Sequence, residues 1–185
     1  MTDQSSNLPS TSVEPLQLHL GGKQAKPGWK ILNIQPGPDV DYVGSCTDLS
    51  QFANGSVDAI YASHVYEHLS YSSELPIALK EAYRVLKPDG KLYIGVPNLE
   101  VLCKLMLTPG LDLQQRFHVQ RMMFGGQIDA FDYHKVGLTQ EILFAFLGQA
   151  GFRRAEQHQQ FNLFDDTTHL EFLGAPISLN VIAFK

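Results

Sequence analysis

The stretch from Val57 to Pro97 constrains the fold of this chain more than any other. Its first part, Val57–Ser63 (VDAIYAS), is apolar along most of its length, which is typical of a strand covered on both faces. An amphipathic helix follows and ends at Lys87–Gly90, and Lys91–Pro97 (KLYIGVP) predicts a second buried strand. A strand, a helix and a strand in this order form a right-handed βαβ unit by default. The chain is therefore predicted to be an α/β protein with a mostly parallel sheet.

The rest of the chain supplies further elements for the same sheet. Glu100–Phe124 is amphipathic and predicts one helix, and a last helix is capped by Thr139 and ends at Gly151, where a left-handed residue belongs. Short strands are predicted at residues 16–20, 29–34, 40–43 and 177–185. They are bounded by glycine or proline or marked by alternating apolar residues.

The connection between the first two predicted strands is unusually short. Only the residues from Gly21 to Gly28 separate them, whereas a parallel crossover normally needs roughly 10–12 residues. We therefore predict a Rossmann-like, mostly parallel sheet flanked by helices, with a shortened first crossover after the glycine turn.

Composition excludes several classes of function. The net charge is −5, so neither nucleic acid nor a membrane is expected as the main partner, and a small molecule is expected instead. Cys46 and Cys103 are far apart and form no thiolate cluster, and no metal site is predicted. Residues 1–15 are polar, without an apolar signal core, and are expected to form a mobile arm before a single domain at residues 16–185. We expect a cytoplasmic protein, and its oligomeric state stays open.

Several segments in a fixed order carry the strongest functional signal. In this order they resemble the class I S-adenosylmethionine (SAM)-dependent methyltransferases, and most closely small predicted members whose first motif is LNLGCG. The resemblance is close over Leu16–Asn98 and looser over the rest of the chain, and it implies a methyltransferase fold with SAM as cofactor. The segments are LHLGGKQAKPGW, Asp48-Leu49, SVDAIYASHVYEHL and RVLKPDGKLYI.

The resemblance also implies which residues contact SAM. Gly21 and Gly22 would lie under its methionine portion, because a glycine turn lets the backbone approach a ligand closely. Asn33, at the end of the second strand, would face the ribose hydroxyls. The other implied contacts are Ser45, Asp48 and Leu49 near the adenine, and Ser63 and His64 on the floor of the pocket.

Four residues depart from the pattern of this family. Lys23 replaces the second glycine of the turn, and His19 replaces an Asp or Asn before it. Asn33 and Ser45 replace acids, and an amide can still donate and accept hydrogen bonds, although without a charge. Two functions therefore stay open. The first is SAM-dependent methyl transfer to a small, for example sugar-like, acceptor. The second is a non-catalytic binding domain that kept the fold and lost the cofactor.

The polar segment Gly125–Gly137 (GGQIDAFDYHKVG) is the candidate for the acceptor side. Neutral histidine is suited to accept a proton near pH 7, so we predict His134 as the catalytic residue, with Asp132 orienting it. The alternative is a surface loop that only caps the helix at Thr139. The acidic pair Asp165-Asp166 is expected to be solvated or locally hydrogen-bonded.

A third hypothesis comes from His64-Val65-Tyr66-Glu67-His68, which matches the HxxEH signature of inverted zinc proteases. Zinc would need both histidines on one helical face and a third ligand from elsewhere, with Glu67 as the base. His64, however, follows directly on a predicted strand, and barely one helical turn has room there. We therefore expect this segment to serve a methyltransferase without metal.

Overall fold

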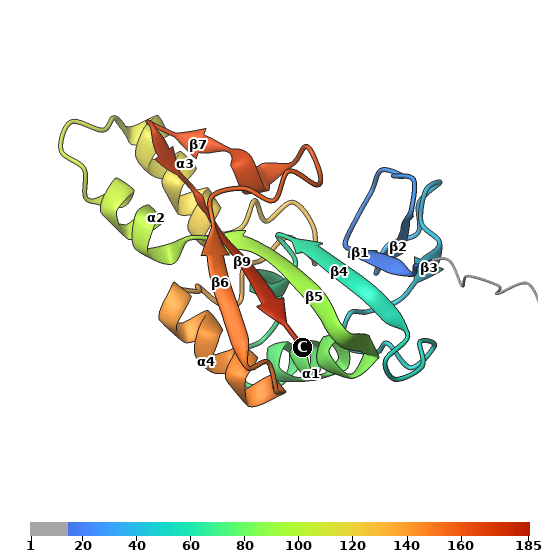
Figure 1. Cartoon of the computed structure of the whole chain (residues 1–185). Coiled ribbons are helices and arrows are strands. Elements are labelled where there is room, and N and C mark those ends of the chain that lie inside the picture. Colours follow the sequence, from blue (N-terminus) through green and yellow to red (C-terminus); the bar gives the residue numbers. More distant parts are fainter. Residues whose placement is uncertain (1–14) are drawn as a thin grey trace, which may run out of the picture.

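A computed structural model describes residues 15–185 (Figure 1). The predicted arm, residues 1–15, lies outside the described residues except for Pro15. The helices are α1 (Glu74–Val85), α2 (Leu99–Met106), α3 (Leu113–Phe124) and α4 (Gln140–Ala150), with short 3₁₀ turns η1 (Tyr66–His68) and η2 (Thr167–His169). The strands are β1 (Gln17–Leu20), β2 (Trp29–Asn33), β3 (Tyr42–Val43), β4 (Val57–Ser63), β5 (Leu86–Pro97), β6 (Arg154–His158), β7 (Glu171–Phe172), β8 (Ala175–Pro176) and β9 (Ser178–Phe184).

The main sheet has seven strands in the order β3-β2-β1-β4-β5-β9-β6. The pairs among β1 to β5 are parallel, and β9 is antiparallel to both β5 and β6. This arrangement confirms the predicted α/β sheet. Leu20 pairs with Leu32 and with Ala62, so the carboxyl ends of β1, β2 and β4 meet at one edge. Ligands of open α/β sheets bind at this edge.

The first crossover is as short as the sequence predicts. Residues 21–28 contain no helix, and β1 and β2 nevertheless pair in parallel. Gly21 has φ +72°, and its N–H donates to the Leu32 carbonyl at 2.8 Å, which closes a tight turn. This connection therefore supplies no helix to cover the sheet.

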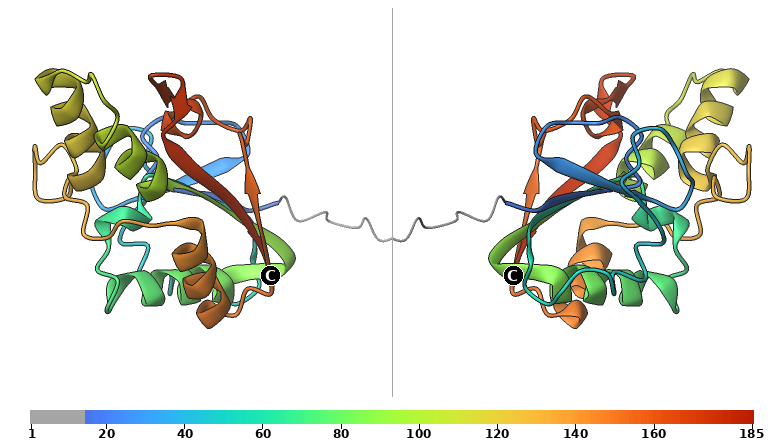
Figure 2. Two further views of the ribbon diagram at one scale, coloured as in Figure 1. Left: turned by 90° about the vertical axis from the view of Figure 1, so that its left-hand side faces the viewer. Right: turned by 90° about the vertical axis from the view of Figure 1, so that its right-hand side faces the viewer.

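The main core lies between the sheet and the helices α1 and α4, which pack along the same face (Figures 1 and 2). The opposite face carries aromatic side chains, among them His19 and Tyr61, and Phe164 from the segment before η2 packs on them. A smaller cluster joins α2 and α3 through Leu102, Leu105 and Val119. Among residues 15–185, no helix is both long and apolar enough to cross a bilayer.

Two predicted boundaries are wrong. The helix predicted over Glu100–Phe124 is two helices, because Pro109-Gly110 interrupts it and Asp112 opens α3 with a capping box. The predicted stop at Lys87–Gly90 lies inside β5, which begins at Leu86 and changes register against β4 at a bulge.

The last predicted helix is confirmed at both ends. Thr139 Oγ1 accepts a hydrogen bond from Ile142 N at 3.3 Å, and Gly151 is left-handed with φ +113°. The edge strand β6 carries no strand signal in the sequence, because four of its five residues, RAEQH, are polar. It pairs only with β9.

Candidate functional site

The turn after β1 is braced by Asn33 from β2. Asn33 Nδ2 donates to the carbonyls of Gly21 at 3.2 Å and Gly22 at 2.9 Å, and its Oδ1 accepts from Gln35 N at 2.9 Å. Both amide hydrogens are therefore used, and the side chain is buried. The ribose contact of Asn33 stays a prediction, and the structure shows that its amide hydrogens bind the carbonyls of the turn. We call Gly21, Gly22 and Asn33 the glycine-turn region.

Both glycines of this region lie against other side chains. A Cβ on Gly21 would be 2.6 Å from Val65 Cγ2, and one on Gly22 would be 2.6 Å from His19 Nδ1. The packing of the chain itself therefore requires glycine at both positions. Gly21 remains exposed at the tip of the turn, and the side chain of Lys23 is exposed rather than packed over it.

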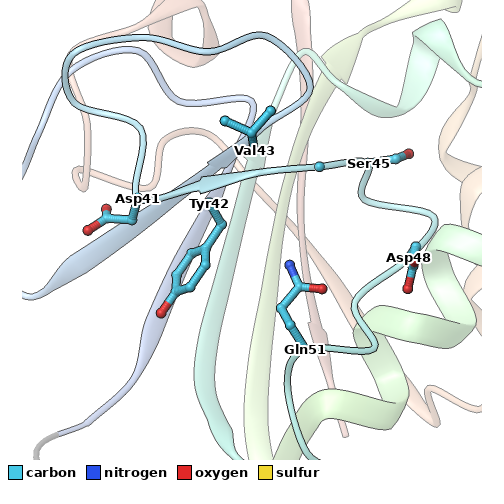
Figure 3. A pocket seen from close by; sticks show the side chains of 7 residues that line it. Asp41, Tyr42, Val43, Ser45, Asp48 and Gln51 are labelled. Atoms are coloured by element: carbon cyan, nitrogen blue, oxygen red, sulfur yellow. The ribbon is translucent and has the colours of Figure 1, made fainter.

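An open hollow of about 430 Å³ lies beside β3 and holds two of the predicted adenine contacts, Ser45 and Asp48 (Figure 3). Asp48 is exposed, and hydrogen bonds from Ser50 hold its pKa below the usual value, so it is ionised at neutral pH. Leu49, the third predicted contact, is fully buried in the core, and its N–H donates to Glu81 Oε2 at 3.0 Å. The hollow is lined by Asp41, Tyr42, Val43, Gly44, Ser45, Asp48 and Gln51.

Ser63 is the last residue of β4 and His64 follows it, and both are half-buried. The ring nitrogens of His64 lie 3.3 Å from Ser63 Oγ and 3.3 Å from Ser178 Oγ. His64 has φ +53°, which is uncommon for a residue other than glycine. Burial lowers its pKa to about 4, so the ring is neutral at neutral pH.

Asp166 is more deeply embedded than the sequence suggests. Thr168 donates to its Oδ1 from the backbone at 2.9 Å and from the hydroxyl at 2.7 Å, in agreement with the predicted local bonding. Tyr61 from β4 also donates to Asp166 Oδ2 at 2.7 Å. No local sequence signal could reveal this second contact, because it joins segments more than a hundred residues apart.

The buried Glu67 and the half-buried His68 and His134 form a polar group that we call the Glu67 cluster. One nitrogen or oxygen from each residue lies within 4.8 Å of the others. The Glu67 side chain is 1% exposed, and neither of its oxygens has a hydrogen-bond partner among the described residues. His134 Nδ1 is also buried and unpaired there, and the centroids of the two imidazole rings are 4.9 Å apart.

Main-chain hydrogen bonds fix this cluster. The N–H groups of Lys135 and Val136 donate to the Glu67 carbonyl at 2.7 and 3.2 Å. His68 Nδ1 lies 3.2 Å from the Tyr133 carbonyl. The loop before α4 is therefore attached to the η1 turn after β4, and His134 is held beside Glu67 and His68.

Burial keeps the cluster uncharged. It raises the pKa of Glu67 to about 8 and lowers the pKa of His68 and His134, and the His68 ring lowers that of His134 further. At neutral pH most Glu67 carboxyls are therefore protonated and both imidazoles are neutral. A bound cation would favour the ionised form of Glu67.

In the structure, two predicted sets of residues do not come together as expected. Asp132 Oδ2 accepts from Ile128 N at 3.4 Å, and no hydrogen bond joins Asp132 to His134 among the residues described. In the HxxEH motif, Glu67 and His68 lie in the cluster, but the second histidine there is His134 instead of His64. Sequence spacing could not show this, because His134 comes from a distant loop.

Known proteins resemble this chain in sequence pattern and in fold. Residues 23–94 match the family model described as a methyltransferase domain. No curated protein matches the chain significantly in sequence. A SAM-dependent methyltransferase from Archaeoglobus fulgidus is 16% identical, with a TM-score of 0.59 over 92% of this chain and 86% of that one.

Two further solved structures have the same fold. A possible histamine N-methyltransferase from Thermotoga maritima is 18% identical, with a TM-score of 0.57 over 96% of this chain and 84% of that one. The 1,6-didemethyltoxoflavin-N1-methyltransferase of Burkholderia thailandensis, solved with S-adenosylhomocysteine, is 14% identical, with a TM-score of 0.58 over 93% and 72%. Other similar structures are longer, and this chain spans 61% of one and 53% of another.

Proposed function

We propose that this chain transfers a methyl group from SAM to a small-molecule acceptor, because residues 23–94 match a methyltransferase-domain model and the fold resembles solved SAM-dependent methyltransferases. The observation that carries this proposal is the position of the Glu67 cluster. It follows β4 directly, and Val65, two residues before Glu67, packs against Gly21 of the glycine turn. Unpaired buried polar groups thus lie next to the turn on which the family binds its cofactor.

The residues around the sheet edge fit SAM at three points. Gly21 is exposed at the turn, Ser63 ends β4, and Ser45 and Asp48 line the hollow beside β3. These residues would hold the methionine portion, the floor and the adenosine portion of SAM. SAM supplies the electrophilic methyl group. The role that we assign to Asn33 is to hold the turn, because its amide hydrogens are already used.

The acceptor side is assigned to His134. Methyl transfer from a sulfonium is a displacement, so the enzyme must align a lone pair of the acceptor with the methyl group. His134 is neutral at neutral pH, and its Nδ1 has no hydrogen-bond partner among the described residues. Asp132 acts on it through its charge, which raises the pKa of His134 against the effect of burial.

The proposed acceptor is small and is not a polyanion, because the net charge of −5 repels nucleic acids and acidic membranes. We propose a cytoplasmic location on the sequence grounds given above. The loops that shape an acceptor pocket in this fold do not reveal the identity of the acceptor.

A specific observation favours a second function, a non-catalytic binding domain. Each glycine of the turn already packs against a side chain, and the Asn33 amide is used within the protein. These internal contacts would account for the glycine-turn region without a cofactor.

Calorimetric titration with SAM and with S-adenosylhomocysteine separates the two functions. Micromolar binding is expected, and Asp48→Asn should weaken it roughly tenfold, the value of one hydrogen bond to a charged group. Asp89→Asn, a change at an exposed residue far from the hollow, should leave the affinity unchanged. No binding at millimolar ligand would contradict methyl transfer and support the binding domain.

A further inference from the structure

The Glu67 cluster contains more unsatisfied polar atoms than a folded protein normally tolerates in one place. Both Glu67 oxygens and His134 Nδ1 are buried without a partner among the described residues. Buried polar groups in proteins are almost always hydrogen-bonded, and an exception needs an explanation. Glu67, His68 and His134 each place one donor atom within 4.8 Å of the others, and nothing among the described residues pairs with either Glu67 oxygen or with His134 Nδ1. We propose that Glu67, His68 and His134 bind one divalent transition metal ion of the zinc type.

The donor set selects the class of metal. Two imidazoles and one carboxylate suit zinc and its first-row neighbours, whereas calcium and magnesium prefer oxygen ligands alone, and Cu(I) prefers sulfur. Zinc binds nitrogen and oxygen at about 2.0–2.2 Å, so two of its ligands lie at most about 4.4 Å apart. The donor atoms of the cluster already lie within 4.8 Å of one another, so small side-chain rotations suffice.

The surroundings orient the ligands as metal sites require. A histidine that binds a metal usually gives its other ring N–H to a carbonyl or carboxylate. His68 Nδ1 is paired in this way with the Tyr133 carbonyl, which leaves Nε2 for the metal. The two hydrogen bonds to the Glu67 carbonyl join the loop with His134 to the η1 turn, so the three ligands are held together before the ion binds.

The neighbouring ammonium group of Lys135 does not neutralise Glu67, and His64 of the HxxEH motif is not one of the proposed ligands. The ammonium group of Lys135, next to His134 in sequence, pairs with Glu74 at 2.8 Å and not with Glu67. His64, the first histidine of the HxxEH motif, has serine hydroxyls near both ring nitrogens. The proposed ligand set is therefore distinct from the one that the motif predicts.

Three protein ligands leave coordination positions open. Sites of this kind bind water or an oxygen of a substrate in those positions, whereas purely structural zinc sites are closed by four protein ligands. The proposed ion would therefore take one oxygen-bearing ligand at the carboxyl end of β4. Metal binding itself stands on the contacts of the cluster and does not depend on methyl transfer.

The test is calorimetric titration of the EDTA-treated full chain with ZnCl₂, in the absence of SAM. We expect one Zn²⁺ per chain. Glu67→Gln and His134→Ala should weaken binding by more than the about 10–100-fold that loss of an outer-shell partner costs. His169→Ala is the matched control, because His169 pairs with Asp165 away from the cluster, and it should keep the wild-type affinity. His64→Asn should also keep it.

X-ray absorption of the zinc-loaded wild type tests the site independently of whether any variant folds. We expect two imidazole ligands, oxygen ligands and no sulfur. Absence of zinc binding at millimolar concentration, unchanged affinity in His134→Ala, or a sulfur ligand from either cysteine would each overturn the proposal. These results are independent of SAM titration, so the metal site and methyl transfer can fail separately.

Discussion

The glycine-turn region and the Glu67 cluster lie next to each other, yet they treat their polar groups in opposite ways. Asn33 uses both amide hydrogens and accepts one hydrogen bond, and all its partners are main-chain atoms of the turn or of its own strand end. Glu67 is buried as deeply, and its carboxyl oxygens have no partner among residues 15–185. The polar groups of the glycine-turn region are hydrogen-bonded within the protein. Those of the Glu67 cluster are free to bind a ligand.

This difference separates residues that build the site from residues that bind a ligand. A saturated buried polar group stabilises the fold and is costly to replace, because its partners are left unsatisfied. An unsatisfied buried group destabilises the fold until a ligand arrives. Substitutions in the two regions should therefore change stability in opposite directions.

The largest effect is expected for Asn33→Asp, which introduces the acid of the family pattern. A carboxylate cannot donate to the carbonyls of Gly21 and Gly22 and would face them as a like partial charge. The variant should lose about 4 kcal/mol of unfolding free energy, from two broken hydrogen bonds, one buried and one part-buried, and from the repulsion between the carboxylate and the carbonyls. Urea denaturation with parallel SAM titration measures this. A variant of wild-type stability that binds SAM more tightly would show that Asn33 faces the ligand after all.

Glu67→Gln should increase the unfolding free energy, whereas Asn33→Asp decreases it. The pKa of Glu67 is raised from 4.5 to about 8 in the folded chain, so the folded state binds the proton more tightly and loses stability as pH rises from 4.5 toward 8. Glutamine stays neutral and avoids this loss. In EDTA at pH 7 the variant should be about 3 kcal/mol more stable than wild type, and equal to it near pH 4.5. Equal stability at both pH values would mean that the carboxyl has a partner in solution.

The decrease in unfolding free energy at acidic pH should depend on His19. Burial lowers its pKa from 6.5 to about 4, although Asp166 acts in the opposite direction, so the folded state resists protonation and stability falls as pH drops from 6.5 to 4. His64 behaves in the same way. In His19→Leu, the loss of unfolding free energy between pH 7 and pH 4.5 should therefore be about 2.5 kcal/mol smaller than in wild type. Part of the loss should remain, because His64 still titrates.

Urea denaturation at several pH values measures this effect, with His169→Gln as the control. His169 is half-exposed and lies outside the aromatic cluster of His19, Tyr61 and Phe164. If His19→Leu and wild type lose the same unfolding free energy between pH 7 and pH 4.5, the His19 ring accepts a proton without unfolding the chain.

Local sequence signals predicted most of the fold because they act over a few residues. The apolar run of β4, the cap at Thr139 and the left-handed Gly151 each follow from neighbouring side chains. The break at Pro109-Gly110 carries an equally local signal, which the longer amphipathic pattern outweighed. The site was harder to predict. The resemblance located the segments, but it could not show that Asn33 turns back to its own turn or that His134 joins Glu67, because those contacts depend on the folded loop.

The smallest of these effects concerns the loop that carries His134. Gly125 and Gly110 both have a positive φ, +87° and +82°, and Gly125 also has ψ 165°, a conformation that only glycine normally adopts. A Cβ on Gly125 would clash with the Asp132 carbonyl oxygen, whereas one on Gly110 would meet nothing within 4 Å. Alanine at Gly110 costs about 1 kcal/mol for the positive φ. Gly125→Ala should cost about 2 kcal/mol more, because the loop must shift to relieve the clash.

A comparison of Gly125→Ala with Gly110→Ala tests whether zinc binding by the Glu67 cluster depends on the loop that carries His134. Both variants replace a glycine of positive φ, but only Gly125→Ala forces the loop away from Asp132, so Gly110→Ala serves as the control. If the main-chain bonds from Lys135 and Val136 hold His134 in place, a shifted loop should weaken zinc binding in Gly125→Ala and leave Gly110→Ala at the wild-type affinity. Equal zinc affinity in the two variants would mean that η1 alone determines the geometry of the cluster. The loop would then contribute only the His134 side chain, and its rigid attachment would not be part of the site.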